Sequence, residues 1–168
     1  MLYWLENILR HGINPRLYPV DSIRNGLQQI RTLQLQDGKT MNSLLADLEY
    51  QLTAAYLSYV CRLKFGFLPP ERRWNDSIDH IPLKQCDVKF DRISLKRCDM
   101  EFALSALDSL RANPTAAFHW AQPSSRLYKK MQEELVRVND WGKTDTTDYY
   151  WDRLLLNLER ARWQYARL

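Results

Sequence analysis

The chain has 168 residues, which is enough for one domain that buries a core without a metal ion or disulfide. Hydrophobic residues make up 45% and charged residues 26%, a balance that excludes an intrinsically disordered chain. The net charge is only +4, with basic residues scattered among acidic ones, so the sequence predicts no nucleic-acid surface.

The positions of charged residues and glycines argue against several other classes of protein segment. The longest stretch without a charged residue, Ala112 to Ser125, contains two prolines, so no membrane insertion is expected. The N-terminus lacks the pattern of a signal peptide. The five glycines stand far apart, which excludes phosphate-cradling loops, and no cofactor is predicted. The densest basic segment, Arg62 to Arg73, is expected to be a solvated helix end.

Hydrophobic spacing is helical from the N-terminus. A short helix beginning at Leu2 is expected to end at Gly12, before Pro15. A second helix follows, with Asp21 and Ser22 as cap candidates.

The clearest helix spans 42–65. Its apolar residues recur at three-and-four spacing, which predicts a core-facing stripe on a central helix. Gly66 and the Pro69-Pro70 pair end it. The stripe consists of Leu44, Leu45, Leu48, Leu52, Ala55, Tyr56, Tyr59 and Leu63.

A long irregular loop is predicted over 66–94, with at most a short strand near Val88 and Phe90. A helix over 95–112 is expected to end at Asn113-Pro114. Its expected inward residues are Ala103, Leu104, Leu107 and Leu110.

Two more helices complete the chain. Pro123-Ser124-Ser125 is expected to cap a helix that Gly142 ends, and Asp145, Thr147 and Asp148 favour the start of a last helix. The inward residues of the former are expected to be Leu127, Met131, Leu135 and Val138. The predicted fold is all-α, a compact bundle of about six helices with one long irregular loop over 66–94.

No residue pattern predicts an enzyme. The three histidines, His11, His80 and His119, lack a local catalytic signature, and each is expected at the surface. A zinc site from His80, Cys86 and Cys98 fits no familiar spacing. An odd number of cysteines argues against a disulfide framework, and Cys61 is expected to be buried and reduced.

Four segments resemble the scaffold domain of large, multidomain L,D-transpeptidases. These are RHGINPRLYPVDSI from Arg10, the run from Leu45 to Trp74, the run from Phe102 to Val138, and LLLNLERARWQY from Leu154. The last is similar to the "NxERxRW" helix that leads into the catalytic domain of these bacterial enzymes. They cross-link peptidoglycan through a separate YkuD-type domain.

The resemblance implies a non-catalytic chain, because none of the three cysteines follows the family's Ser-x-Gly pattern. It implies a helical scaffold domain over 1–141, a linker over 142–147, and a helix over 148–168 leading towards a catalytic domain. The expected partner is that catalytic domain, with peptidoglycan as a further candidate, in the periplasm or cell envelope. The alternatives are a free-standing helical adaptor that binds a protein partner and, least favoured, an intact enzyme using His80 and Cys86.

The last helix has two apolar faces. One carries Leu154 and Leu158, and Leu156 and Trp163 form a second patch roughly 120° away at 100° per residue. We expect the first face to dock on the scaffold and the second to bridge to the catalytic domain, with Trp163 partly exposed. The interface candidates are therefore Leu156, Trp163 and Arg162.

Overall fold

The computed structural model describes residues 1–33, 40–67, 98–139 and 145–165. Over these ranges every regular element is helical, with seven α-helices and two short 3-10 helices, which confirms the all-α prediction. The predicted long loop lies outside the described residues except for Gly66 and Phe67 at its start. The short strand predicted near Val88 also lies outside them.

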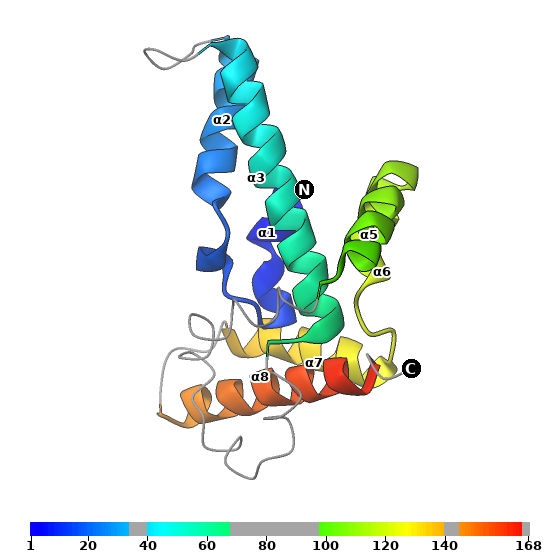
Figure 1. Cartoon of the computed structure of the whole chain (residues 1–168). Helices are drawn as coiled ribbons and strands as arrows, with labels where there is room; N and C mark the ends of the chain where they lie inside the picture. Colours follow the sequence, from blue (N-terminus) through cyan, green and yellow to red (C-terminus); the bar gives the residue numbers. More distant parts are fainter. Residues whose placement is uncertain (34–39, 68–97, 140–144, 166–168) are drawn as a thin grey trace.

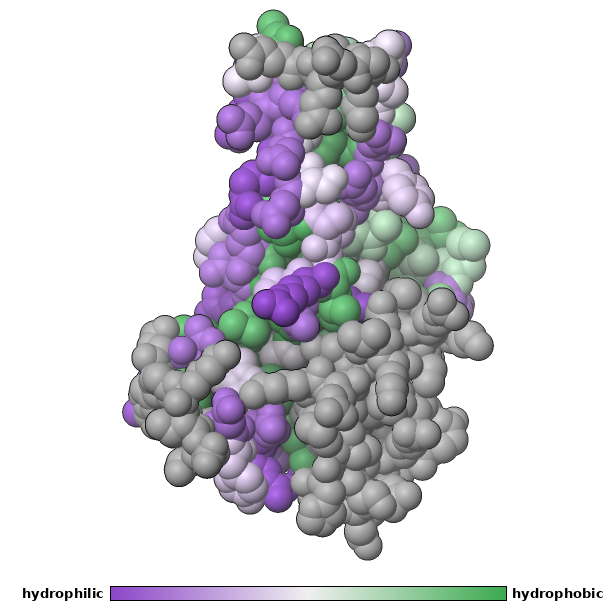
Figure 2. Space-filling model, turned by 90° about the vertical axis from the view of Figure 1, so that its left-hand side faces the viewer, coloured by the Kyte–Doolittle hydropathy of each residue, from purple (hydrophilic) through white to green (hydrophobic). Residues whose placement is uncertain are grey.

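Two pairs of helices form the frame of the molecule. Helices α2 (Val20–Thr32) and α3 (Met41–Phe65) pack side by side. Helices α7 (Arg126–Asn139) and α8 (Asp145–Tyr165) lie side by side across the lower end of α3 (Figure 1). Figure 2 looks onto the α2 side and shows mostly hydrophilic residues over the upper half, with hydrophobic residues visible between them.

A third pair stands beside α3. Helix α5 (Met100–Ala112) and helix α6 (Pro114–Trp120) pack on each other, and α5 contacts α3 (Figure 1). Asn113 ends α5, as predicted, and its Oδ1 accepts hydrogen bonds from the backbone N–H groups of Thr115 and Ala116, at 3.1 and 3.0 Å. The same residue thereby begins α6, a helix that the sequence pattern did not predict.

The chain begins with α1 (Leu2–Glu6), followed by the 3-10 helices η1 (Ile8–His11) and η2 (Pro15–Leu17). The helical segment ends at Gly12, as the sequence predicted, but it is divided at Asn7 into α1 and η1, and Gly12 has a left-handed φ of 65°. A Cβ atom there would come within 2.6 Å of Leu155 on α8. Glycine is therefore needed at this point both for its backbone and for the close approach of α8.

Helix α3 begins with a capping box in which Thr40 and Ser43 exchange side-chain hydrogen bonds, at 3.2 and 3.1 Å. Most of the predicted stripe is buried or half-buried, but Leu45 is 47% exposed. Leu45 follows Leu44 by 100° around the helix, so it lies outside the face that α2 covers. The cap candidates of α2 were also wrong, because Pro19 precedes its first turn without a side-chain cap.

The predicted inward faces of α5 and α7 are confirmed in part, because Leu107 and Leu110 pack against the core and Met131, Leu135 and Val138 are buried. On α5 the buried residue is Ala106, whose carbonyl oxygen accepts a hydrogen bond from the Tyr56 hydroxyl at 2.9 Å, whereas Leu104 is 55% exposed. On α7 Tyr128 is buried and Leu127 is 65% exposed. Leu104 and Leu127 were therefore wrongly expected to face inward, and Ala106 and Tyr128 are buried instead.

The chain contains a disulfide that the sequence reasoning did not expect. Cys61 on α3 is bonded to Cys98, which directly precedes α5, and the Cα atoms are 5.8 Å apart. Cys61 is fully buried, as predicted, but the expectation that it is reduced was wrong. The two residues lie 37 positions apart, and their pairing depends on how α5 packs against α3. Cys86 lies outside the described residues.

The division of the chain by a linker over 142–147 stays a prediction. Helix α8 begins at Asp145 and packs against both α7 and α3. In the part of the chain that the structure describes, no helix combines the length and apolar character needed to cross a membrane.

Candidate functional site

The three interface candidates on α8 are all buried within this chain. Leu156, Arg162 and Trp163 are 4%, 1% and 2% exposed. The expectation that Trp163 is partly exposed was therefore wrong. Helix α8 crosses α3 and packs along α7, so more than one of its faces is covered. Their assignment to an interface with a following domain stays a prediction.

Near the end of α8, Glu159 and Arg162 form a buried ion pair. The carboxylate Oε2 and the guanidinium Nη1 are 3.0 Å apart, and both side chains are 2% exposed. The other carboxylate oxygen of Glu159 accepts a hydrogen bond from Trp163 Nε1 at 2.9 Å and another from the backbone N–H of Phe67. The carboxylate thus connects α8 to the segment that follows α3.

Arg162 makes the complementary connections. Its guanidinium donates to the backbone carbonyl of His11 at the end of η1, and its Nε and Nη2 donate to the Tyr128 hydroxyl on α7, both at 3.3 Å. A guanidinium offers five donors in a planar fork, which suits it to join several acceptors at once. One side chain therefore ties α8 to η1 and α7, beside its ion pair with Glu159.

His11 extends this network and was expected at the surface, which was wrong because it is 3% exposed. Its Nδ1 accepts a hydrogen bond from Gln132 Nε2 at 2.6 Å, and its Nε2 lies 3.2 Å from the Tyr59 hydroxyl. Because Nδ1 is the acceptor, the neutral ring carries its proton on Nε2 and donates it to Tyr59. Burial, and then the charge of Arg162, lower the pKa of His11 to about 3.

We call these contacts the α8 junction, which consists of His11, Tyr59, Phe67, Tyr128, Gln132, Glu159, Arg162 and Trp163. Burying two charges is costly unless their remaining hydrogen bonds are satisfied, and here both partners make several. Gly66 also fits closely against it, because a Cβ atom there would overlap the Glu159 carboxylate, and its φ is 72°.

A second arginine lies beside the junction. Arg62 is 1% exposed, so the expectation of a solvated helix end was wrong for the first residue of that basic segment. Its guanidinium carbon lies 5.2 Å from the ring centroid of Tyr18 and 5.7 Å from that of Phe67. Arg162 lies 5.8 Å from the same Phe67 ring. The Phe67 ring is therefore within cation–π distance of both guanidinium groups.

The chemistry of the α8 junction is that of a structural joint. Its members are a neutral histidine, tyrosine hydroxyls and a neutralised ion pair, and burial raises the pKa of Tyr59 and of Tyr128. In the described ranges, no group of three or more His, Cys, Asp or Glu residues could hold a metal ion. Cys98 is in a disulfide, and the other two residues of the predicted zinc alternative lie outside the described ranges.

Of the residues in the α8 junction, sequence reasoning named Arg162 and Trp163, but as contacts to a following domain. It did not name Glu159, and it placed His11 at the surface. One signal was available, because Glu159 and Arg162 are three residues apart and therefore share one side of a helix. No local pattern indicated that His11, more than a hundred positions away, would meet them.

A family model described as a scaffold domain matches residues 1–135. The match covers most of the chain and ends within α7, so α8 lies beyond it. No curated protein and no solved structure matches the chain.

Proposed function

The chain belongs to the scaffold-domain family, and on that premise we propose that it is the non-catalytic scaffold of a bacterial L,D-transpeptidase-like cell-wall enzyme. In this proposal the domain holds α8 in a defined direction, and α8 positions a catalytic domain for peptidoglycan cross-linking. The segment from Leu154 to Tyr165 resembles the helix that leads into such catalytic domains.

The observation that carries the proposal is the buried Glu159–Arg162 pair. It joins the last described turns of α8 to η1, to α7 and to the segment after α3 through directional hydrogen bonds. Apolar packing alone permits a helix to slide or rotate by small amounts, whereas a satisfied buried ion pair has one good geometry. A domain attached to α8 would therefore inherit a defined orientation.

The Cys61–Cys98 disulfide supports a location in the periplasm or cell envelope. Disulfides persist in oxidising compartments and are rare in the reducing cytosol. The disulfide also argues against Cys61 and Cys98 as nucleophiles, because acyl transfer by cysteine requires a free thiolate, and Cys86 lacks the preceding Ser-x-Gly. Incubation with a carbapenem, followed by mass spectrometry of the intact chain, is expected to leave all three cysteines unacylated.

The gene sequence beyond codon 168 tests the proposal. We expect a continuation that contains a histidine and a Ser-x-Gly-Cys segment. A stop codon at that point would contradict the proposal and support a free-standing adaptor. The adaptor is favoured by exposed apolar side chains on α5 and α6, where Met100, Leu104 and Trp120 are 75%, 55% and 41% exposed.

The continued protein allows a test of positioning. Arg162→Gln should reduce peptide cross-linking while carbapenem acylation of the catalytic cysteine continues, because the site is intact but misplaced. Lys130→Gln removes the same charge from an exposed position on α7 and should leave both activities unchanged. Equal cross-linking by the wild-type protein and the Arg162→Gln variant would contradict a positioning role.

A further inference from the structure

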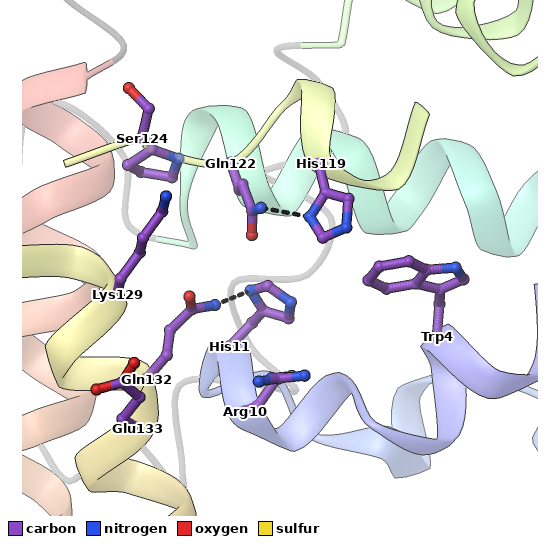
Figure 3. Close-up of a pocket in the computed structure, with 10 residues that line it drawn as sticks. Trp4, Arg10, His11, His119, Gln122, Ser124, Lys129, Gln132 and Glu133 are labelled. Atoms are coloured by element: carbon purple, nitrogen blue, oxygen red, sulfur yellow. Dashed lines mark hydrogen bonds between the residues drawn. The ribbon is translucent and has the colours of Figure 1, made fainter. Parts of the chain in front are cut away.

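A polar pocket of about 490 Å³ opens between η1, the connection from α6 to α7, and α7 (Figure 3). Its size is within the range of sites that hold small ligands. The lining residues that matter here are Trp4, Arg10, His11, His119, Lys129 and Gln132. The resemblance and the proposed function assign no role to this pocket.

The base of the pocket is polar and uncharged. His11 and Gln132 are 3% and 8% exposed, and their side chains are joined by the 2.6 Å hydrogen bond from Gln132 Nε2 to His11 Nδ1 (Figure 3). Because the pKa of His11 is lowered to about 3, the ring is neutral at neutral pH. Gln132 uses its amide N–H on His11, and a primary amide also carries a carbonyl oxygen that accepts hydrogen bonds.

Two cations stand at the edge of the pocket. Arg10 and Lys129 are exposed, and neither forms an ion pair with any carboxylate of the described residues. Glu133 is the one acidic residue among the described residues of the lining. The charged side chains of the lining, Arg10, Lys129 and Glu133, carry a net charge of +1. That charge is complementary to a ligand with a single negative charge.

One wall of the pocket is formed by the aromatic rings of Trp4 and His119, and neighbouring side chains fix their positions. The Trp4 ring stacks on Phe118, with centroids 5.1 Å apart, and meets the His119 ring edge-on at 4.6 Å. Gln122 Nε2 donates to His119 Nδ1 at 2.6 Å (Figure 3). The wall therefore offers apolar ring surface beside two glutamine amides.

We propose that this pocket binds the free carboxylate end of a short peptide. Arg10 and Lys129 would hold the carboxylate, since charge-assisted hydrogen bonds are the strong ones. The glutamine amides provide both donors and acceptors, as a peptide backbone requires, and the Trp4–His119 wall would contact a small apolar side chain. A doubly charged phosphate matches the net charge of +1 less well. The proposal does not depend on the proposed function.

The test is an NMR titration of the ¹⁵N-labelled chain with acetyl-Ala-Ala-Ala that has a free carboxylate. The matched ligand is the same peptide with an amidated C-terminus, and a third titration uses inorganic phosphate. We expect saturable shifts around η1 and the start of α7 with the free carboxylate, at a Kd of about 1 mM or lower. The amidated peptide should bind at least about tenfold more weakly.

Paired charge variants locate the site. Arg10→Gln with Lys129→Gln should weaken carboxylate binding about tenfold or more. Arg16→Gln with Lys130→Gln removes the same charge from exposed residues that do not line the pocket and should leave the affinity unchanged. Equal binding of the two peptides, or equal losses in the two double variants, would overturn the proposal. So would phosphate binding as tightly as the peptide, or no saturation by about 10 mM.

Discussion

The two ends of helix α3 are held by different interactions. At its start, α3 packs on α2 through apolar residues such as Ile23, Leu44 and Leu48, and a Cβ atom on Gly26 would come within 2.8 Å of Leu48. At its end, α3 meets α8 beside the Glu159–Arg162 pair and the tyrosines around it. Both contacts bury apolar side chains, but only the second depends on directional hydrogen bonds between charged groups.

The difference shows how one domain can tolerate substitutions at one helix contact while it fixes the geometry of another. An apolar helix pair accepts substitutions of similar volume, because its contacts have no strict direction. A buried ion pair does not, because removal of one partner leaves the other charged and desolvated. The α8 junction should therefore respond to substitution far more sharply than the α2–α3 pair.

The largest effect is expected for Arg162→Met. The change removes the Arg162 guanidinium from the buried Glu159 carboxylate and leaves the neutral donors of Phe67 and Trp163 on it. We expect a loss of about 3–5 kcal/mol in the free energy of unfolding, measured by urea titration of the helical circular dichroism. Glu159→Gln with Arg162→Met should recover much of that loss, because a neutral amide still accepts from Phe67 and Trp163. A double variant that is less stable than Arg162→Met would show that the buried charge is not the cause.

Core truncations on the two faces of α8 should have similar effects. Leu158→Ala should cost about 2–5 kcal/mol, because Leu158 is fully buried in the core between α7 and α8. Trp163→Ala should cost a comparable amount, because Trp163 is 2% exposed and bonded to Glu159. Leu45→Ala on the exposed side of α3 serves as the control, with a change within about 0.5 kcal/mol. A small effect for Trp163→Ala in the same urea titration would restore the idea that its face awaits another domain.

These expectations separate what the sequence could predict from what it could not. Periodicity predicted α3, most of its stripe, and the stop at Asn113, because apolar burial and proline geometry act locally. It misplaced Leu104 and Leu127, because Ala106 and Tyr128 face the core through close approach and a hydroxyl hydrogen bond. Pattern reasoning treats polar residues as solvated, so it placed Arg62 and His11 at the surface. Tyr18 beside Arg62, Tyr59 and Gln132 bonded to His11, and Cys98 bonded to Cys61 are all distant from them in the sequence.

The α8 junction should also be the part of the fold that is sensitive to acid. His11 has a pKa of about 3 in the folded chain, against about 6.5 when unfolded, so the unfolded state binds more protons between these values. The contribution of His11 to the free energy of unfolding is therefore fully present above about pH 6.5, and it is lost as the pH falls towards 3. Between pH 6.5 and 4.5 the loss from this group should be about 2–3 kcal/mol.

Because carboxylates also titrate in acid, the measurement is a comparison of urea-unfolding free energies across pH. His11→Gln should show a shallower fall over that interval than the wild-type chain, whatever its stability at pH 7. Parallel curves for the two proteins would show that His11 does not carry the acid sensitivity.

The smallest effect is expected at the opposite end of α3. Thr40→Ala removes the side-chain oxygen that accepts from the Ser43 backbone N–H at 3.2 Å, and it leaves one of the first amide groups of the helix to water. Thr40 is exposed, so no cavity or buried charge results, and the expected loss is about 1 kcal/mol in the same urea titration. Thr40→Ser keeps the acceptor and should stay close to the wild-type value. If Thr40→Ala cost as much as Arg162→Met, the start of α3 would depend on a directional contact as strongly as its end does, and the contrast between the two ends would fail.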